Sequence, residues 1–249
     1  MRLIFFICIA IAMVGCSVNK EVYNSNGIKV SPKVTTDNFP SAKLTLLTKD
    51  NSVKKGKNNF TFEINSYKLK QQTPEANSNH LANSHKGQHI HFIVNNGPYQ
   101  AKYVPTFEAD FNTNSNIVLA FLSRSFHESV KENGAYVLKQ YQFNDEPPYV
   151  DIEKDPLLFY SRPKGTYQLD KGDKILLDFY LANTKLSRHG HKVKITLDNH
   201  QFIVDKWQPY IIEGLQKGVH EIQIELIDSK GDAISSSFNN SGIRKFNIK

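Results

Sequence analysis

Hydrophobic and polar residues alternate along most of this chain, which predicts β-strands. Val193, Ile195 and Leu197 alternate with charged or polar neighbours, and residues 221–226 repeat the pattern. A period of two places one row of side chains on a core and the other in water. Outside residues 1–15, no long stretch has the period of an amphipathic helix. The pattern therefore predicts an all-β protein.

The same order of predicted strands occurs twice along the chain. The matched segments are 60–69 with 177–186, 87–96 with 190–199, 102–105 with 206–209, and 117–122 with 221–226. Their spacings agree closely, except for an insertion at 70–86 in the first copy. Each copy has room for about seven short strands, as in an immunoglobulin-like β-sandwich. We therefore expect two tandem immunoglobulin-like β-sandwiches.

This duplication gives the predicted domain organisation. The parts are a lipoprotein signal peptide at 1–15, a lipidated flexible tether at 16–40, a first β-sandwich at 41–143, a linker at 144–156, and a second β-sandwich at 157–249. The tether is assigned because that segment is rich in Asn, Ser, Thr, Lys and Pro. Residues 107–111 and 210–215 are expected to be irregular or to form a short helical turn.

The N-terminal residues indicate export. Arg2 precedes an apolar stretch at 3–14 that is too short to span a bilayer, and Met13-Val14-Gly15-Cys16 resembles a lipobox. The sequence therefore predicts lipidation of Cys16 and a lipid anchor in the cell envelope, at the outer membrane if the cell is Gram-negative. The alternative is an ordinary secretory signal, which also takes the mature chain out of the cytoplasm.

The charge of the chain limits the classes of partner, and its cysteine content limits how the fold can be stabilised. The formal net charge is +7, but the lysines are scattered rather than arranged in a stripe with aromatic residues. Nucleic acid is therefore excluded as a partner, whereas an anionic lipid or glycan surface remains. No cysteine follows Cys16, so burial rather than disulfides must stabilise the fold.

Four histidines form the sharpest chemical signal. His89 and His91 lie two residues apart on a predicted strand, so they share a face opposite Ile90. Two imidazoles on one face can bind Zn or Cu, with a third ligand from the inserted loop that carries His80 and His85. The sequence therefore gives a candidate metal site of His80, His85, His89 and His91.

The second copy supplies the alternative explanation of these histidines. Lys192 and Lys194 occupy the positions that match His89 and His91, so the face tolerates solvated charge. Both histidines are then ordinary surface residues. No role is assigned to the dispersed His127, His189, His191, His200 and His220.

Three aromatic residues are weaker candidates for ligand binding. Tyr99 follows a turn, and Tyr103 matches Trp207, the only tryptophan, in the second copy. Aromatic rings near strand ends can stack on sugar or peptide ligands. The alternative is that these residues pack in the cores.

No catalytic constellation stands out, so no catalytic residue is assigned. Ser161-Arg-Pro-Lys164 matches SxxK, but Pro163 opposes the helix that this chemistry needs, and its partner motifs are absent. A Ser-His-Asp triad stays open because its members need not be adjacent.

Several segments together resemble a family of uncharacterised Bacteroidota lipoproteins with duplicated immunoglobulin-like modules. The segments are Gln88–His91, Asn95–Tyr99, Phe159–Tyr167 and Asp205–Tyr210. Some members of that family are labelled phosphopeptide-binding, a label that usually rests on a forkhead-associated module. This chain has neither the Gly-Arg nor the Ser-x-x-His loop of that module. The resemblance therefore implies no known activity.

These observations favour a membrane-anchored cell-envelope lipoprotein that acts as a non-catalytic binding or scaffolding protein for an unknown protein or glycan. The first alternative is an envelope protein that binds Zn or Cu through the histidines between His80 and His91. The second is a cryptic hydrolase.

Overall fold

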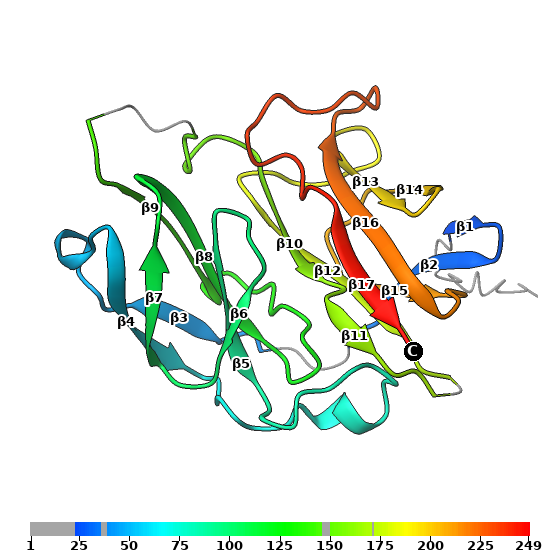
Figure 1. Cartoon of the computed structure of the whole chain (residues 1–249), viewed down its shortest axis with the longest axis horizontal. Helices are drawn as coiled ribbons and strands as arrows, with labels where there is room; N and C mark the ends of the chain where they lie inside the picture. The colour runs from blue at the N-terminus through cyan, green and yellow to red at the C-terminus, as the bar shows by residue number, and fades with distance from the viewer. Residues whose placement is uncertain (1–22, 36–38, 146–149, 171) are drawn as a thin grey trace, which may run out of the picture.

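The computed structural model describes residues 23–35, 39–145, 150–170 and 172–249 (Figure 1). In these ranges the chain forms strands β1–β17 and two short 3-10 helices, at Asp50–Ser52 and Pro74–Asn77. None of the helices in the described ranges has the length and apolar character needed to cross a membrane. Cys16 lies outside these ranges, so its lipidation stays a prediction.

Seven strands in chain order build the first sandwich. They are β3 (Lys43–Leu46), β4 (Gly56–Asn65), β5 (His89–Val94), β6 (Gln100–Lys102), β7 (Thr106–Phe111), β8 (Ser115–Ser123) and β9 (Tyr136–Gln142). One sheet has the order β3-β4-β7, and the other has the order β6-β5-β8-β9. Aromatic side chains dominate the core between them, with Phe60 and Phe92 fully buried and their ring centroids 5.1 Å apart.

The second sandwich repeats this strand order. Its strands are β10 (Leu157–Arg162), β11 (Gly165–Tyr167), β12 (Ile175–Ala182), β13 (Lys192–Leu197), β14 (His200–Val204), β15 (Tyr210–Glu213), β16 (Gly218–Ile227) and β17 (Arg244–Ile248). The first, second and fifth main strands (β10, β12, β15) share one sheet, and β14-β13-β16-β17 form the other, as in the first sandwich. The added strand β11 runs parallel to β17. The prediction of an all-β chain with two tandem immunoglobulin-like sandwiches is confirmed.

The two sandwiches pack against each other, with the first on the left and the second on the right in Figure 1, and together they form four layers of sheet. The inner layers are β6-β5-β8-β9 and the sheet that contains β10 and β12. Nearly every residue of β8 and all of β10 and β12 are buried, because both faces of these strands are covered. A third core between the sandwiches contains Phe121 and Tyr180, whose rings stack 4.9 Å apart.

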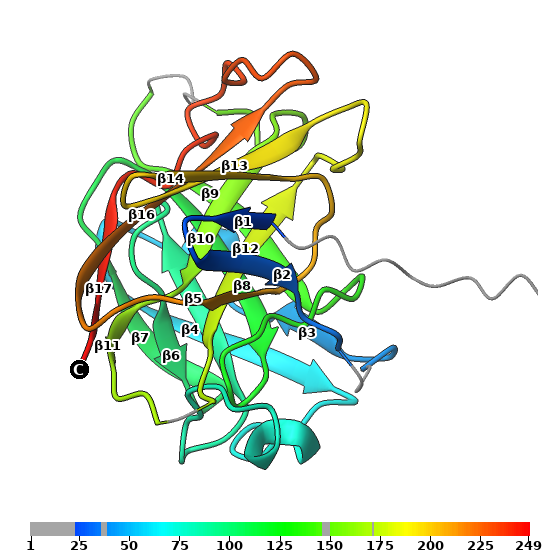
Figure 2. The same ribbon diagram turned by 90° about the vertical axis from the view of Figure 1, so that its right-hand side faces the viewer.

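The N-terminal segment corrects the predicted tether. β1 (Tyr23–Ser25) and β2 (Ile28–Pro32) form a hairpin, and β2 pairs with β15. This hairpin lies in the foreground of Figure 2. Its apolar Ile28 and Val30 join the core of the second sandwich, so residues 23–32 belong to the fold. The segments 107–111 and 210–213 are also strands rather than irregular, because each pairs with a neighbouring strand.

A pair of valines tests the role of the hairpin. Val30 is fully buried, whereas Val34, just beyond the strand, is 57% exposed. We expect Val30→Ala to lower the free energy of unfolding by about 2 kcal/mol, through lost burial and a cavity. The same substitution at Val34 should have almost no effect. Urea unfolding of both variants measures this. Equal stabilities would contradict the packing of residues 23–32 in the fold and would support a tether instead.

Candidate metal centre

His89 and His91 project from β5 toward the second sandwich, while Ile90 and Phe92 of the same strand enter the first core. The prediction that both histidines share the face opposite Ile90 therefore agrees with the structure. The expectation of a solvated face is wrong, because both histidines have 0% exposure. The second sandwich covers the β5 face from which they project.

His127 completes a group of three. It lies in the loop between β8 and β9 and adopts a positive φ of 69°. Its Nδ1 lies 3.1 Å from Nε2 of His89, which lies 2.9 Å from Nε2 of His91. The three ligand atoms all lie within 4.8 Å of one another. Two nitrogens bound at about 2.05 Å in a tetrahedral zinc site are about 3.3 Å apart. The two separations that involve His89 are close to this value, and the third is no more than 4.8 Å.

The backbone sets the tautomer of His89. Its Nδ1 lies 2.8 Å from the carbonyl oxygen of Gly87, which can only accept a hydrogen bond, so Nδ1 carries the proton. The Nε2 lone pair of neutral His89 then faces the other two imidazoles. Gly87 has φ +79°, and a Cβ there would lie 2.5 Å from the carbonyl carbon of Lys70. Glycine is therefore required where the chain positions this carbonyl.

Two residues hold His91 from its other sides. Its Nδ1 lies 3.1 Å from the hydroxyl oxygen of Ser161, and its ring stacks on Tyr99 at 3.6 Å between centroids. Ser161 and His91 do not form a hydrolase triad, because the second nitrogen of His91 faces His89 rather than a carboxylate. Ser161 instead orients the imidazole, as groups around metal-bound histidines do.

The environment keeps all three imidazoles neutral near pH 7. Burial lowers the pKa of His89 to about 4, and the charge of Arg162 also lowers it. Burial likewise lowers the pKa values of His91 and His127, with further lowering from neighbouring positive charges. Neutral imidazole is the form that binds a metal ion, so protons do not compete for the site at neutral pH.

Buried ion pairs hold the loop that carries His127. Arg124 and Lys33 both pair with Glu128, at 3.0 and 2.8 Å. Lys131 pairs at 2.6 Å with Asp178 of β12, which is fully buried. The loop is thus fixed to the N-terminal segment on one side and to the second sandwich on the other. His127 itself is only partly buried, which gives an ion a route to the site.

The remaining predicted residues lie in different surroundings. His80 is exposed beside Asp173, at 3.8 Å, and neither His80 nor His85 belongs to the group of three. The ring of Tyr103 lies 4.9 Å from that of His89, so it borders the site. Trp207 donates from its indole nitrogen to the carbonyl of Phe179 and packs against two cores. His127 was missed, although Ser123 pairs with His89 in the ladder and the loop that follows must lie nearby.

These pKa shifts predict a pH-dependent stability for the metal-free protein. The pKa of His89 is about 4 in the fold against 6.5 for the free side chain. Between these values the unfolded chain binds a proton that the folded chain does not, so stability falls as pH falls through this window. The expected loss is about 3 kcal/mol for this residue. Urea unfolding at pH 7.5 and pH 4.5 checks this, and stability that is unchanged or higher at the lower pH would contradict it.

Comparisons with known proteins find distant structural neighbours. No protein-family model and no curated protein matches the chain. Fibronectin(III)-like modules of CbhA from Clostridium thermocellum are 11% identical, with 83% of this chain and 94% of that chain covered and a TM-score of 0.29. Bacteroides ovatus SGBP-B, from a mixed-linkage glucan utilization locus and in complex with a mixed-linkage heptasaccharide, is 8% identical, with coverages of 91% and 71% and a TM-score of 0.21. At these identities and TM-scores, no ligand of either protein can be assigned to this chain.

Proposed function

We propose that this chain is a metal-binding protein of the cell envelope, which holds one zinc or copper ion with His89, His91 and His127. The observation that carries the proposal is the convergence of three ring nitrogens within 4.8 Å, from two different segments of the chain. A set of three imidazoles suits Zn²⁺ and Cu²⁺, and it leaves a fourth position for water or another ligand.

The burial of the site favours binding over catalysis. His89 and His91 have no exposed surface, and a folded loop covers them. A substrate would need access to the fourth position, whereas an ion needs only the partly exposed side of His127. This proposal narrows the broader expectation of a non-catalytic binding or scaffolding protein, and it replaces His80 and His85 with His127 as the third ligand.

The envelope location rests on the N-terminal sequence. We propose that Cys16 carries a lipid, seven residues before the described fold begins at Tyr23. A single exported chain with an anchor would hold its metal site close to a membrane surface. Detergent-phase partitioning of the protein produced in a Gram-negative host checks the anchor.

Metal titration tests the proposed function. Untagged protein treated with a chelator is titrated with Zn²⁺ and Cu²⁺ by calorimetry at pH 7.5, and the metal content of protein purified without chelator is measured by mass spectrometry. We expect one ion per chain with a dissociation constant in the micromolar range or tighter. Absence of saturable binding for both ions would overturn the proposal.

A further inference from the structure

A cavity of about 330 Å³ lies where the two sandwiches meet, beside the candidate metal centre. Its walls come from Tyr99, Tyr160, Lys164, Ile243 and Arg244, together with adjoining residues of the same segments. Ser161 also lines the cavity, and its hydroxyl forms a hydrogen bond with Nδ1 of His91. One residue therefore contacts both the cavity and the histidines. This volume lies within the range of pockets that take small organic ligands.

All of the charged residues that line this cavity are positive. Lys164, Arg244 and Lys245 line it, and no Asp or Glu does. Among the described residues, Lys245 pairs with Glu221, but Lys164 and Arg244 form no ion pair with a carboxylate. Two positive side chains therefore stand at one cavity without counter-charge from those residues.

Arg244 has unused hydrogen-bonding capacity. One of its terminal nitrogens donates to the carbonyl oxygen of Asn96, and its guanidinium lies 5.8 Å from the ring centroid of Tyr160. Its Nε is buried and has no hydrogen-bond partner. A buried donor without a partner is costly, so the structure satisfies the guanidinium only in part.

Next to the residues that line the cavity, the buried Arg162 adds to the positive field. Arg162 is only 8% exposed, and its Nε is also buried without a partner. Its guanidinium lies 5.3 Å from the ring centroid of Tyr99, and the ammonium of Lys164 lies 4.2 Å from the same centroid. Like charges held this close repel one another, so a negative group nearby would stabilise the arrangement.

We propose that this cavity binds an oxyanion, a carboxylate or phosphate group, carried on a small organic ligand. Arg244 and Lys164 bind the anion, because guanidinium and ammonium groups form charge-assisted hydrogen bonds with such oxygens. Tyr160 and the exposed side chain of Ile243, which is 63% accessible, contact the apolar part of the ligand. This proposal does not depend on the metal centre.

Binding of simple probes tests the proposal on full-length, chelator-treated protein, so that a metal ion cannot supply the anion site. Inorganic phosphate, glucuronate and neutral glucose are titrated at low ionic strength and followed by NMR or calorimetry. We expect phosphate and glucuronate to bind and glucose not to bind. Tighter glucuronate would indicate a carboxylate ligand, and tighter phosphate a phosphorylated one. Binding should weaken as salt is added.

Three variants locate the site. Arg244→Gln should weaken anion binding about tenfold or more, the effect of losing one charge-assisted hydrogen bond. Lys164→Gln should weaken it in the same direction. Lys164 is an exposed residue, and the substitution removes one hydrogen bond, from its Nζ to the carbonyl oxygen of Tyr99 at 2.8 Å. Arg188→Gln removes the same charge at an exposed position outside the cavity and should leave affinity unchanged. No saturable anion binding, or equal loss in all three variants, would overturn the proposal.

Discussion

Replacing His127 with alanine is expected to abolish tight metal binding. Its Nδ1 is one of three ring nitrogens that converge, and no other His, Cys, Asp or Glu among the described residues joins that group. Loss of a group that merely orients a ligand weakens metal binding by about 10–100-fold, so loss of a ligand should cost more than about 100-fold. Competition with a chromogenic chelator measures the effect, with His89→Ala as a second variant of the same expected size.

The matched controls for this result are His80→Ala and His85→Ala. Both histidines lie close to His89 in the sequence, but neither belongs to the group of three. These variants should bind zinc as the original chain does. If His85→Ala lost the metal and His127→Ala kept it, the inserted loop rather than the β8–β9 loop would supply the third ligand.

Replacing Asp178 with alanine is expected to cause the largest loss of stability. Asp178 is fully buried and accepts hydrogen bonds from Lys131 and from both the backbone and the hydroxyl of Ser129. Burial raises the pKa of Asp178, and the charge of Lys131 opposes that shift. Removing Asp178 leaves the ammonium of Lys131, whose side chain is only 16% exposed, without its carboxylate, which costs about 3 kcal/mol. Urea unfolding measures the loss.

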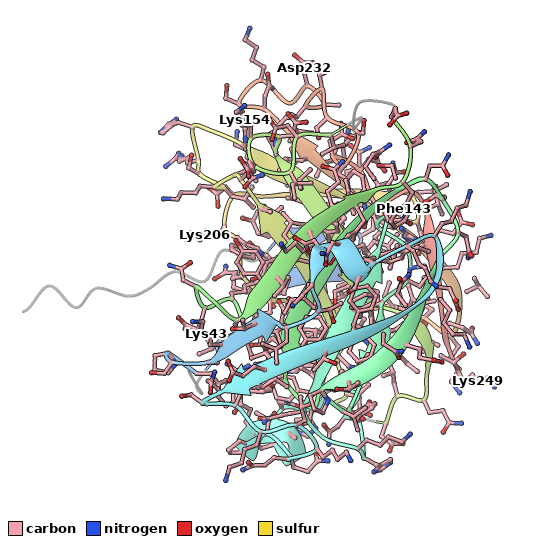
Figure 3. All side chains as sticks on the ribbon, turned by 90° about the vertical axis from the view of Figure 1, so that its left-hand side faces the viewer. Lys43, Phe143, Lys154, Lys206, Asp232 and Lys249 are labelled. Atoms are coloured by element: carbon pink, nitrogen blue, oxygen red, sulfur yellow. The ribbon has the colours of Figure 1, made fainter. Side chains whose placement is uncertain are left out.

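The same variant should also weaken metal binding, because the Lys131–Asp178 pair fixes the loop that carries His127 to the second sandwich. Asp151→Ala is the control, since Asp151 pairs with the exposed Lys154 and such pairs contribute little. Figure 3 shows Lys154 at the periphery of the molecule. If Asp178→Ala were as stable as Asp151→Ala, the buried pair would not hold the two sandwiches together.

The fold was predictable because strand patterns and repeats are local properties of the sequence. The hairpin of β13 and β14 turns at Asp198-Asn199, where a positive φ of 51° at Asp198 suits this turn chemistry. The added strands β1 and β2 could not be predicted in the same way. They are short, and they are stable only because β15 offers a free edge far along the chain.

The site was only half predictable, because the two copies occupy different environments. Lys192 and Lys194 of β13 face solvent in an outer sheet, whereas the matching His89 and His91 face a second sandwich. A sequence signal for this difference existed. Residues 117–122 are continuously apolar, whereas the matching residues 221–226 alternate, which indicates a strand buried on both faces in the first copy only.

Anomalous diffraction at the zinc edge, from crystals of the zinc-loaded protein, shows whether the three imidazoles hold an ion. We expect one strong peak between the imidazoles of His89, His91 and His127, with each nitrogen at about 2.0–2.1 Å from the ion. Zinc bound instead beside His80 or His85, or no peak between the three imidazoles, would contradict it.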